Sequence, residues 1–199
     1  MLVEQEVTRM EEKAPVSSIH NVACTVKHNT LVNSEYRHLC LSAPESILDI
    51  TPGQFFNVLC PETDAHKPYL RRPMSIYGAD LEKGELHFLY KVQGEGTRAM
   101  ATMVPGDEFS VVGPLGIGFT IEPSWKHLVL VARGVGLATL APLAKMARDN
   151  GCKLTAICSA RSPEALMSID YFKQQGADVV TLTDSEGTSS LENLDGILS

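Results

Sequence analysis

The chain has 199 residues and a net charge of −7, and 44% of its residues are hydrophobic. This length fits one large domain or two small ones, and the hydrophobic share is sufficient for a buried core. The acidic balance, without a basic stripe, excludes nucleic acid and anionic membranes as natural partners, and no apolar run reaches the roughly 18 residues of a membrane span. Residues 1–17 are a polar lead-in without the apolar stretch of a signal peptide, so we expect a cytoplasmic protein.

The strand-like part of the sequence runs from Ile19 to about Gly113, with turn residues between short segments. The expected strands cover residues 19–28, 35–42, 54–60, 73–78, 85–92 and 108–112. A helix is expected over residues 97–103, where good helix formers follow a glycine turn. Short strands at this spacing indicate an antiparallel β-barrel or sandwich, and we assign a β-barrel domain to residues 18–118.

The pattern changes after a glycine-rich loop at residues 113–118 and a linker at 119–125. Strands and helices then alternate: strand 127–132, helix 138–149, strand 154–159, helix 163–175 and strand 178–183. The first of these strands is a continuous apolar run, which is typical of a strand covered on both faces. This alternation predicts a parallel sheet, and we assign an α/β nucleotide-binding domain to residues 126–199.

The cysteines and histidines are scattered along the chain. The sequence contains five cysteines and six histidines, without Cys-x-x-Cys or His-x-x-x-His spacing. Cys40 and Cys158 lie inside apolar runs, which favours reduced and buried thiols. Because metal sites are recognised in a sequence by closely spaced ligands, we assign no metal-binding residue.

The segment Arg71-Arg72-Pro73-Met74-Ser75 leads into the fourth expected strand. Side chains alternate along a strand, so the first arginine, the proline and the serine are expected on one face and the second arginine on the other. An arginine fork suits a pyrophosphate, and a serine hydroxyl can form a hydrogen bond to a ring nitrogen. An edge strand with solvated arginines fits the same spacing, which leaves both interpretations open.

Two glycine motifs precede expected helices. The first motif is Gly94-Glu95-Gly96-Thr97. The free N–H groups at the start of a helix attract anions, so this motif is a candidate phosphate site. An ordinary turn in which Thr97 caps the helix would have the same sequence. In the second, Gly134-x-Gly136 follows a buried strand and resembles the start of a dinucleotide fingerprint, with Thr139 in place of the third glycine. Neither motif alone identifies a ligand.

The succession of motifs resembles the ferredoxin reductase superfamily. It comprises residues 52–55, 71–76, 90–97, 113–119 and 134–142. Within the superfamily, the sequence is most similar to the electron-transfer subunits of NAD-dependent dihydroorotate dehydrogenase and their paralogues. The resemblance covers nearly the whole chain from about Ile19, and it implies that the barrel binds FAD and the α/β domain binds NAD(P)H.

The resemblance also assigns cofactor-binding residues. They are Arg72, Pro73, Ser75, Tyr90, Val92, Gly96, Thr97, Gly134 and Gly136. By this resemblance the arginine, Gly96 and the threonine hold the FAD pyrophosphate, while the serine lies near the reactive edge of the flavin ring. The tyrosine and the valine lie along the flavin, and Gly134 and Gly136 face the nicotinamide nucleotide. The implied chemistry is hydride transfer from the nicotinamide to flavin N5, followed by release of electrons to a partner.

The sequence departs from the family at three points. Arg133 stands where the family usually has glycine, so that it either clamps a phosphate or blocks the nucleotide. The late strand beside the nicotinamide and the cysteine cluster of an iron–sulfur centre have no counterpart before Ser199, so the C-terminal part of the α/β domain is expected to be missing. We therefore expect a flavoprotein electron-transfer subunit that works with a redox partner protein or catalytic subunit. The alternatives are a stand-alone NAD(P)H:flavin reductase and a regulatory subunit that has lost nucleotide binding.

Overall fold

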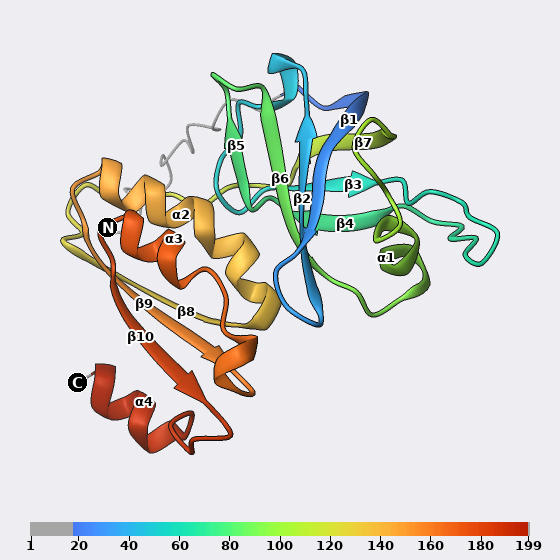
Figure 1. Cartoon of the computed structure of the whole chain (residues 1–199). Coiled ribbons are helices and arrows are strands. Elements are labelled where there is room, and N and C mark those ends of the chain that lie inside the picture. Colours follow the sequence, from blue (N-terminus) through green and yellow to red (C-terminus); the bar gives the residue numbers. More distant parts are fainter. Residues whose placement is uncertain (1–17, 199) are drawn as a thin grey trace, which may run out of the picture.

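The fold consists of an antiparallel sheet followed by a parallel sheet with helices (Figure 1). The computed structural model describes residues 18–198, so the lead-in expected over residues 1–17 lies outside the described residues. The antiparallel sheet has seven strands in the order β4-β3-β7-β1-β2-β6-β5, and the parallel sheet has the order β10-β9-β8. The predicted combination of a β-barrel and an α/β unit is confirmed, with the antiparallel sheet curled into a half-barrel.

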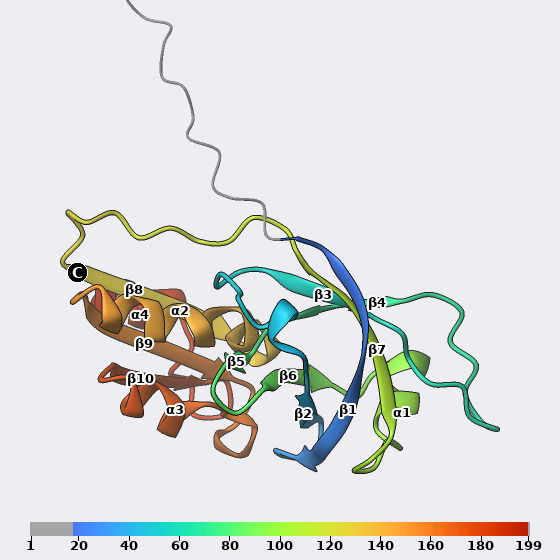
Figure 2. The same cartoon turned by 90° about the horizontal axis from the view of Figure 1, so that it is seen from above.

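The half-barrel contains all the strands that the sequence predicts and one more. Its strands are β1 (His20–Leu31), β2 (Tyr36–Ser42), β3 (Phe55–Val58), β4 (Arg72–Ser75), β5 (Gly78–Asp80), β6 (Glu85–Lys91) and β7 (Glu108–Leu115). The helix between β6 and β7 is α1 (Glu95–Met100), and a single turn, η1 (Glu45–Ile47), follows β2. Figure 2 shows the long β1 curling around the barrel.

Three predicted boundaries in the barrel are wrong. The helix expected over residues 97–103 begins two residues earlier and ends at Met100. The strand expected over residues 73–78 is divided into β4 and β5, because the chain changes partner between them: Ile76 N–H donates to Gln54 O, whereas Tyr77 N–H donates to His87 O. The loop expected from residue 113 begins later, because β7 stays paired with β1 as far as Gly113, opposite His20, and ends only at Leu115.

The barrel core is built from alternating strand residues. Phe56, Phe88 and Phe109 are at most 1% exposed, and the rings of the first two meet edge to face at 6.1 Å. A Cβ atom added at Gly113 would lie 2.4 Å from the Phe56 ring, so a glycine is required where β7 crosses this ring.

The α/β unit follows the predicted order of strands and helices. Its elements are β8 (His127–Arg133), η2 (Gly134–Gly136), α2 (Leu137–Asp149), β9 (Lys153–Ala160), η3 (Pro163–Ala165), α3 (Ile169–Gln174), β10 (Asp178–Thr183) and α4 (Leu191–Leu198). The helix expected over residues 163–175 is interrupted, since Ser168 takes a left-handed conformation with φ of 61° directly before α3. Helix α4 was not expected from the sequence.

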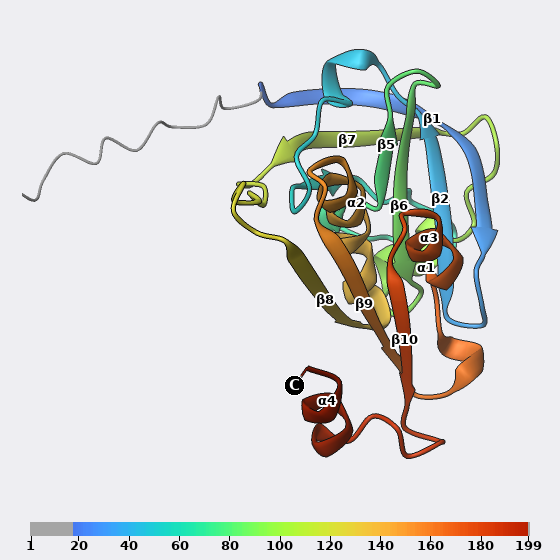
Figure 3. The same ribbon diagram turned by 90° about the vertical axis from the view of Figure 1, so that its left-hand side faces the viewer.

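The two sheets meet through a shared apolar cluster. Helices α2 and α3 lie on one face of the parallel sheet (Figure 3), and η2 and α2 contact β6 of the barrel. Tyr36 and Leu89 of the barrel are buried in the same cluster as Leu137 and Phe172 of the α/β unit. This packing fixes the barrel against the ends of the parallel strands, where the cavities described below are found. None of the helices in residues 18–198 is long and apolar enough to cross a membrane.

Candidate functional site

A cavity of about 360 Å³ lies at the junction, between β4 and β6 on one side and α2 on the other. We call it the β4–α2 cavity. It is lined by Arg72, Pro73, Met74, Ser75, Leu89, Tyr90, Lys91, Gln93, Thr97, Val135, Gly136, Ala138 and Thr139. Because β4 is the last strand of its sheet, the cavity runs along the strand's unpaired edge. Consecutive residues from both faces of β4 therefore line the cavity. The alternation of side chains along a strand predicted that only every second residue would do so.

The two adjacent arginines of β4 and its approach have different surroundings. Arg72 lines the cavity, and its Nη1 donates to the carbonyl oxygens of Leu70 at 2.5 Å and Arg71 at 3.3 Å. The Arg71 guanidinium turns the other way and donates to the carbonyl oxygens of Asn57 and Ser110, each at 3.2 Å. Arg71 thus links β3 to β7, and Arg72 is the arginine whose charge faces the cavity.

Gly96 lies behind Arg72 rather than on the cavity wall. It is buried at the start of α1, and an added Cβ atom would lie 2.9 Å from Cys60 Sγ and 3.3 Å from Arg72 Nε. Both distances are shorter than ordinary packing contacts allow. A glycine at this position therefore lets the arginine side chain pack against the helix start.

Thr97 stabilises the turn that leads into α1. Its hydroxyl accepts hydrogen bonds from the N–H groups of Gln93 at 3.0 Å and Gly94 at 3.1 Å, and it donates to Gly94 O at 3.1 Å. The hydroxyl therefore caps the turn, as one of the two interpretations of the motif predicts. Thr97 also lines the cavity. The adjacent Val92 is half-buried against the barrel core, and its N–H donates to Glu35 O at 2.8 Å.

Ser75 is joined to the α/β unit across the cavity. Thr139 Oγ1 donates a hydrogen bond of 2.9 Å to Ser75 Oγ. The serine hydroxyl accepts this hydrogen bond with one of its two lone pairs, which leaves its own proton available to a further acceptor. Thr139 occupies the third position of the glycine fingerprint, where the sequence alone indicates only a departure from that motif.

Tyr90 contributes to the cavity wall, but its hydroxyl points into the barrel. The hydroxyl donates to the side-chain oxygen of Asn29 at 2.9 Å, and the Asn29 amide donates to Met100 O of α1 at 2.8 Å. Burial raises the pKa of Tyr90 to about 12, so the group is neutral. This buried chain of hydrogen bonds joins β6 and β1 to α1.

We expect Tyr90→Phe to lower the free energy of unfolding by about 1 kcal/mol, which is the usual value of one buried hydrogen bond. FAD affinity should stay within about twofold of the parent, because the lost hydroxyl faces Asn29 rather than the cavity. Denaturant unfolding and a flavin titration measure the two quantities. A loss of FAD affinity without a loss of stability would show that the hydroxyl contacts the cofactor.

A second cavity, of about 350 Å³, lies beside the first at the carboxyl ends of β8 and β9. We call it the β8–β9 cavity. It is lined by Glu35, Tyr36, Lys91, Arg133, Gly134, Val135, Ala160, Arg161 and Ala165. Lys91 and Val135 line both cavities. The carboxyl ends of parallel strands are where α/β folds bind nucleotides.

Gly134 is essential to the shape of the second cavity. Its φ is +56°, a left-handed value that favours glycine, and an added Cβ atom would lie 2.8 Å from the Tyr36 hydroxyl. The turn after β8 thus approaches the barrel more closely than a larger residue permits. Gly136 lines the first cavity instead, so the glycine pair spans both.

Arg133 neither projects freely into the second cavity nor closes it. Its guanidinium forms a two-pronged ion pair with Asp184, with an Nη2–Oδ2 distance of 2.5 Å, and it donates to Ser159 Oγ at 3.0 Å. The hydrogen bond from Arg133 holds the pKa of Asp184 below its usual range. The arginine therefore ties the carboxyl ends of β8, β9 and β10 together.

The structure brings most of the sequence-predicted residues to these two adjoining cavities. Six of them line the β4–α2 cavity, namely Arg72, Pro73, Ser75, Tyr90, Thr97 and Gly136. Gly134 lines the β8–β9 cavity, and Val92 and Gly96 line neither. Lys91, Val135 and Thr139 are lining residues that the sequence analysis did not select. Lys91 ends β6, Val135 is the middle residue of the second glycine motif, and Thr139 lies in the first turn of α2, so only their nearness to the motifs pointed to them.

Comparison with known proteins gives the family. Residues 23–119 match the family described as the oxidoreductase FAD-binding domain. The dihydroorotate dehydrogenase B (NAD(+)) electron transfer subunit of Desulforamulus reducens is 37% identical over 142 residues, which are 71% of this chain and 53% of the relative. The subunit of the same name from Fusobacterium nucleatum is 33% identical over 168 residues, which are 83% of this chain and 64% of the relative. The chain thus spans between about half and two thirds of the length of these relatives.

Solved structures share the arrangement of both sheets. An NADH-dependent reduced ferredoxin-NADP oxidoreductase, described for flavin-based electron bifurcation, has a TM-score of 0.70 and 27% identity over 81% of this chain and 56% of its own. The ferredoxin reductase of carbazole 1,9a-dioxygenase has a TM-score of 0.72 and 18% identity over 85% of this chain and 52% of its own, which shows the fold alone. Residues 23–119 therefore match a ferredoxin reductase-like, FAD-binding oxidoreductase domain, and the chain as a whole is similar to proteins built on that domain.

Proposed function

We propose that the chain is the flavin-carrying part of an electron-transfer subunit, with FAD against the β4–α2 cavity and NAD(P)H at the β8–β9 cavity. The observation that carries the proposal is the common wall of the two cavities, formed by Lys91 and Val135. A nicotinamide must lie next to a flavin ring for hydride transfer. Two adjoining cavities, one in the FAD-binding unit and one at the ends of parallel strands, meet that requirement.

The residues of the β4–α2 cavity suit a flavin. Arg72 offers a permanent positive charge for a phosphate, and Ser75 offers a hydroxyl proton for an acceptor on a polar ring. Leu89, Val135 and Met74 supply an apolar surface for the body of the ring system. When bound, FAD supplies the redox chemistry, taking up a hydride and passing electrons on one or two at a time. The protein residues position the cofactor and exclude water.

The partner and the location are part of the same proposal. The named relatives are electron transfer subunits of dihydroorotate dehydrogenase B, and an electron transfer subunit delivers its electrons to another protein. We therefore propose that this chain works with a catalytic subunit or redox protein, in the cytoplasm. We further propose that residues 18–118 form the FAD-binding domain and residues 126–199 contribute the nucleotide-binding domain.

Anaerobic stopped-flow mixing of the oxidised protein with NADH and with NADPH tests the proposal. Loss of flavin absorbance with either nucleotide, and its return when an electron acceptor protein is added, is the expected result. A flavin that is reduced by dithionite but by neither nucleotide would support the alternative of a regulatory subunit without nucleotide binding. Reduction followed by rapid transfer to free flavin would instead indicate a stand-alone reductase.

We expect Asp184→Asn to lower the half-saturating NAD(P)H concentration by up to about fivefold, since an exposed ion pair is worth roughly 0–1 kcal/mol. The side chains of Arg133 and Asp184 are about half exposed, and the substitution frees the guanidinium for a phosphate. Asp178→Asn is the matched control, because Asp178 pairs with Lys153 at the opposite end of the sheet. An unchanged or higher half-saturating concentration in Asp184→Asn would show that the ion pair does not compete with the nucleotide.

A further inference from the structure

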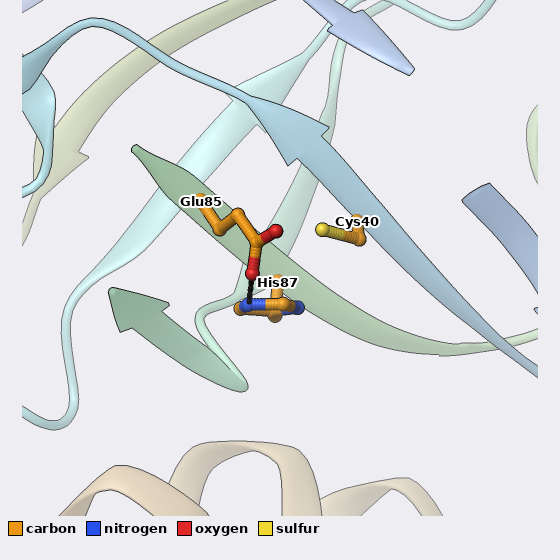
Figure 4. Close-up of side chains that lie close together, drawn as sticks. All are labelled: Cys40, Glu85 and His87. Carbon is orange, nitrogen blue, oxygen red and sulfur yellow. Dashed lines mark ion pairs between the residues drawn. The ribbon is translucent and has the colours of Figure 1, made fainter. Parts of the chain in front are cut away.

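The face of the barrel formed by β2 and β6 carries a cluster of metal-ligating side chains away from both cavities. Cys40 of β2 lies directly opposite His87 of β6, and Glu85 lies two positions earlier on the same face of β6 (Figure 4). One ligand atom from each of these three residues lies within 4.8 Å of the other two. None of the three lines the β4–α2 or the β8–β9 cavity. We call this group the Cys40–Glu85–His87 cluster.

The chemistry of the three groups fits one kind of ion. A thiolate sulfur, an imidazole nitrogen and a carboxylate oxygen are the three donor types that bind Zn²⁺ in proteins. Cys40 is fully buried, whereas the side chains of Glu85 and His87 are 16% and 19% exposed. The cluster thus has a buried thiol and two side chains that reach solvent, from which a water molecule would supply the fourth ligand.

A neighbouring histidine orients the imidazole of the cluster. His87 Nδ1 lies 3.1 Å from His38 Nε2, and the two rings are stacked with centroids 5.2 Å apart. With Nδ1 engaged in this way, Nε2 is the ring nitrogen that faces Glu85 Oε2, at 3.4 Å. Metal-binding histidines usually have their second ring nitrogen held by such a hydrogen bond.

A cation already occupies part of this position. Lys27 Nζ lies 2.5 Å from Glu85 Oε1, and the lysine side chain is 44% exposed. The carboxylate thus attracts positive charge here, and a long exposed side chain can move into solvent when a stronger cation arrives. A metal ion would compete with Lys27 for Glu85.

We propose that Cys40, Glu85 and His87 bind one Zn²⁺ ion, with His38 positioning the imidazole and Lys27 displaced from the carboxylate. On binding, the Cys40 thiol loses its proton to solvent, sulfur and zinc form a bond, and no oxidation state changes. The proposal is independent of the function proposed for the two cavities.

The position of the cluster indicates a structural role at the junction of the two units. His38 meets the Tyr77 ring edge to face at 5.6 Å, and the Tyr77 hydroxyl lies 3.0 Å from Ser168 Oγ of the α/β unit. Tyr77 also packs against Tyr171 of α3 at 5.7 Å. An ion that fixes His87 and His38 would therefore hold this contact between the barrel and the α/β unit.

Titration of the untagged, metal-free protein with Co²⁺, followed by displacement with Zn²⁺, tests the proposal. We expect one Co²⁺ per chain, a thiolate-to-cobalt charge-transfer band, and loss of that band when Zn²⁺ is added. Cys40→Ser should abolish the band, whereas Cys152→Ser, which alters a buried cysteine outside the cluster, should keep it. His38→Ala should weaken binding by roughly 10- to 100-fold while the band remains attainable at high metal concentration.

Three further variants keep the test decisive if Cys40→Ser does not fold. Glu85→Gln and His87→Gln alter partly exposed side chains and should each weaken Co²⁺ binding by at least about tenfold. Lys27→Gln should strengthen it by about fivefold, because a competing charge is removed. Failure to bind Co²⁺, a band that survives in Cys40→Ser, or weaker binding in Lys27→Gln would overturn the proposal. Binding of several ions with equal affinity in all variants would do so as well.

Discussion

Arg72→Ala is expected to weaken FAD binding by about 1.5–3 kcal/mol, which is roughly 10- to 150-fold in Kd. Arg72 lines the β4–α2 cavity. Among the residues that the structure describes, Lys91 is the one other cationic residue in this lining. A planar, permanently charged group binds a pyrophosphate through paired hydrogen bonds, which an alanine cannot replace. Titration of the flavin-free protein with FAD, followed by flavin fluorescence, measures the change.

Arg71→Ala is the matched control and should have the opposite pattern. Its guanidinium bonds to carbonyl oxygens of Asn57 and Ser110, so its removal should lower Tm while FAD affinity changes by less than about threefold. Arg72→Ala should leave the Tm of the flavin-free protein nearly unchanged, since its own contacts are to the adjacent Leu70 and Arg71 carbonyls. Equal retention of FAD by the two variants would show that the assignment of the two arginines is wrong.

Gly96→Ala is expected to weaken FAD binding nearly as much, by about 1–3 kcal/mol, through displacement of the arginine. The new methyl group would lie 2.9 Å from Cys60 Sγ and 3.3 Å from Arg72 Nε, so one of the two side chains must move. Arg72 is the longer and less buried of the two, and it is the one expected to shift. Gly94→Ala is the control, because a Cβ atom at Gly94 meets nothing within 4 Å.

A double-mutant cycle separates this indirect effect from a direct one. If Gly96 acts through Arg72, the substitution Gly96→Ala should cost little further FAD affinity in the Arg72→Ala background. Additive losses would mean that the glycine contacts the cofactor itself, as the family resemblance first suggested. Equal losses in Gly94→Ala and Gly96→Ala would mean that both act by disturbing the turn before α1.

The fold was largely predictable because both periodicities are plain in the sequence. Alternating residues mark the barrel strands, and continuous apolar runs such as residues 127–132 mark the parallel strands. The boundaries that failed depend on contacts that are distant in sequence. The division of residues 73–78 follows from Tyr77 pairing with His87, and the extension of β7 follows from its pairing with His20.

The candidate site was predictable where it consists of local motifs and not where it depends on pairing between strands. The β4 segment and the two glycine turns identified much of the lining, but the hydrogen bond between Thr139 and Ser75 joins two units and has no local signature. The ion pair of Arg133 with Asp184 likewise connects the ends of strands. The Cys40–Glu85–His87 cluster has no signature in the sequence for the same reason, because the register of β2 and β6 brings together residues that are far apart in the chain.

Release of the cofactor from the purified protein tests the central claim most directly. The protein, prepared without added flavin, is denatured, and the supernatant is separated by chromatography against FAD and FMN standards. The geometry of the β4–α2 cavity predicts a yellow protein that releases intact FAD, with markedly less FAD released from Arg72→Ala than from Arg71→Ala. A colourless protein, or one that releases FMN alone, would contradict the assignment of this cavity to FAD.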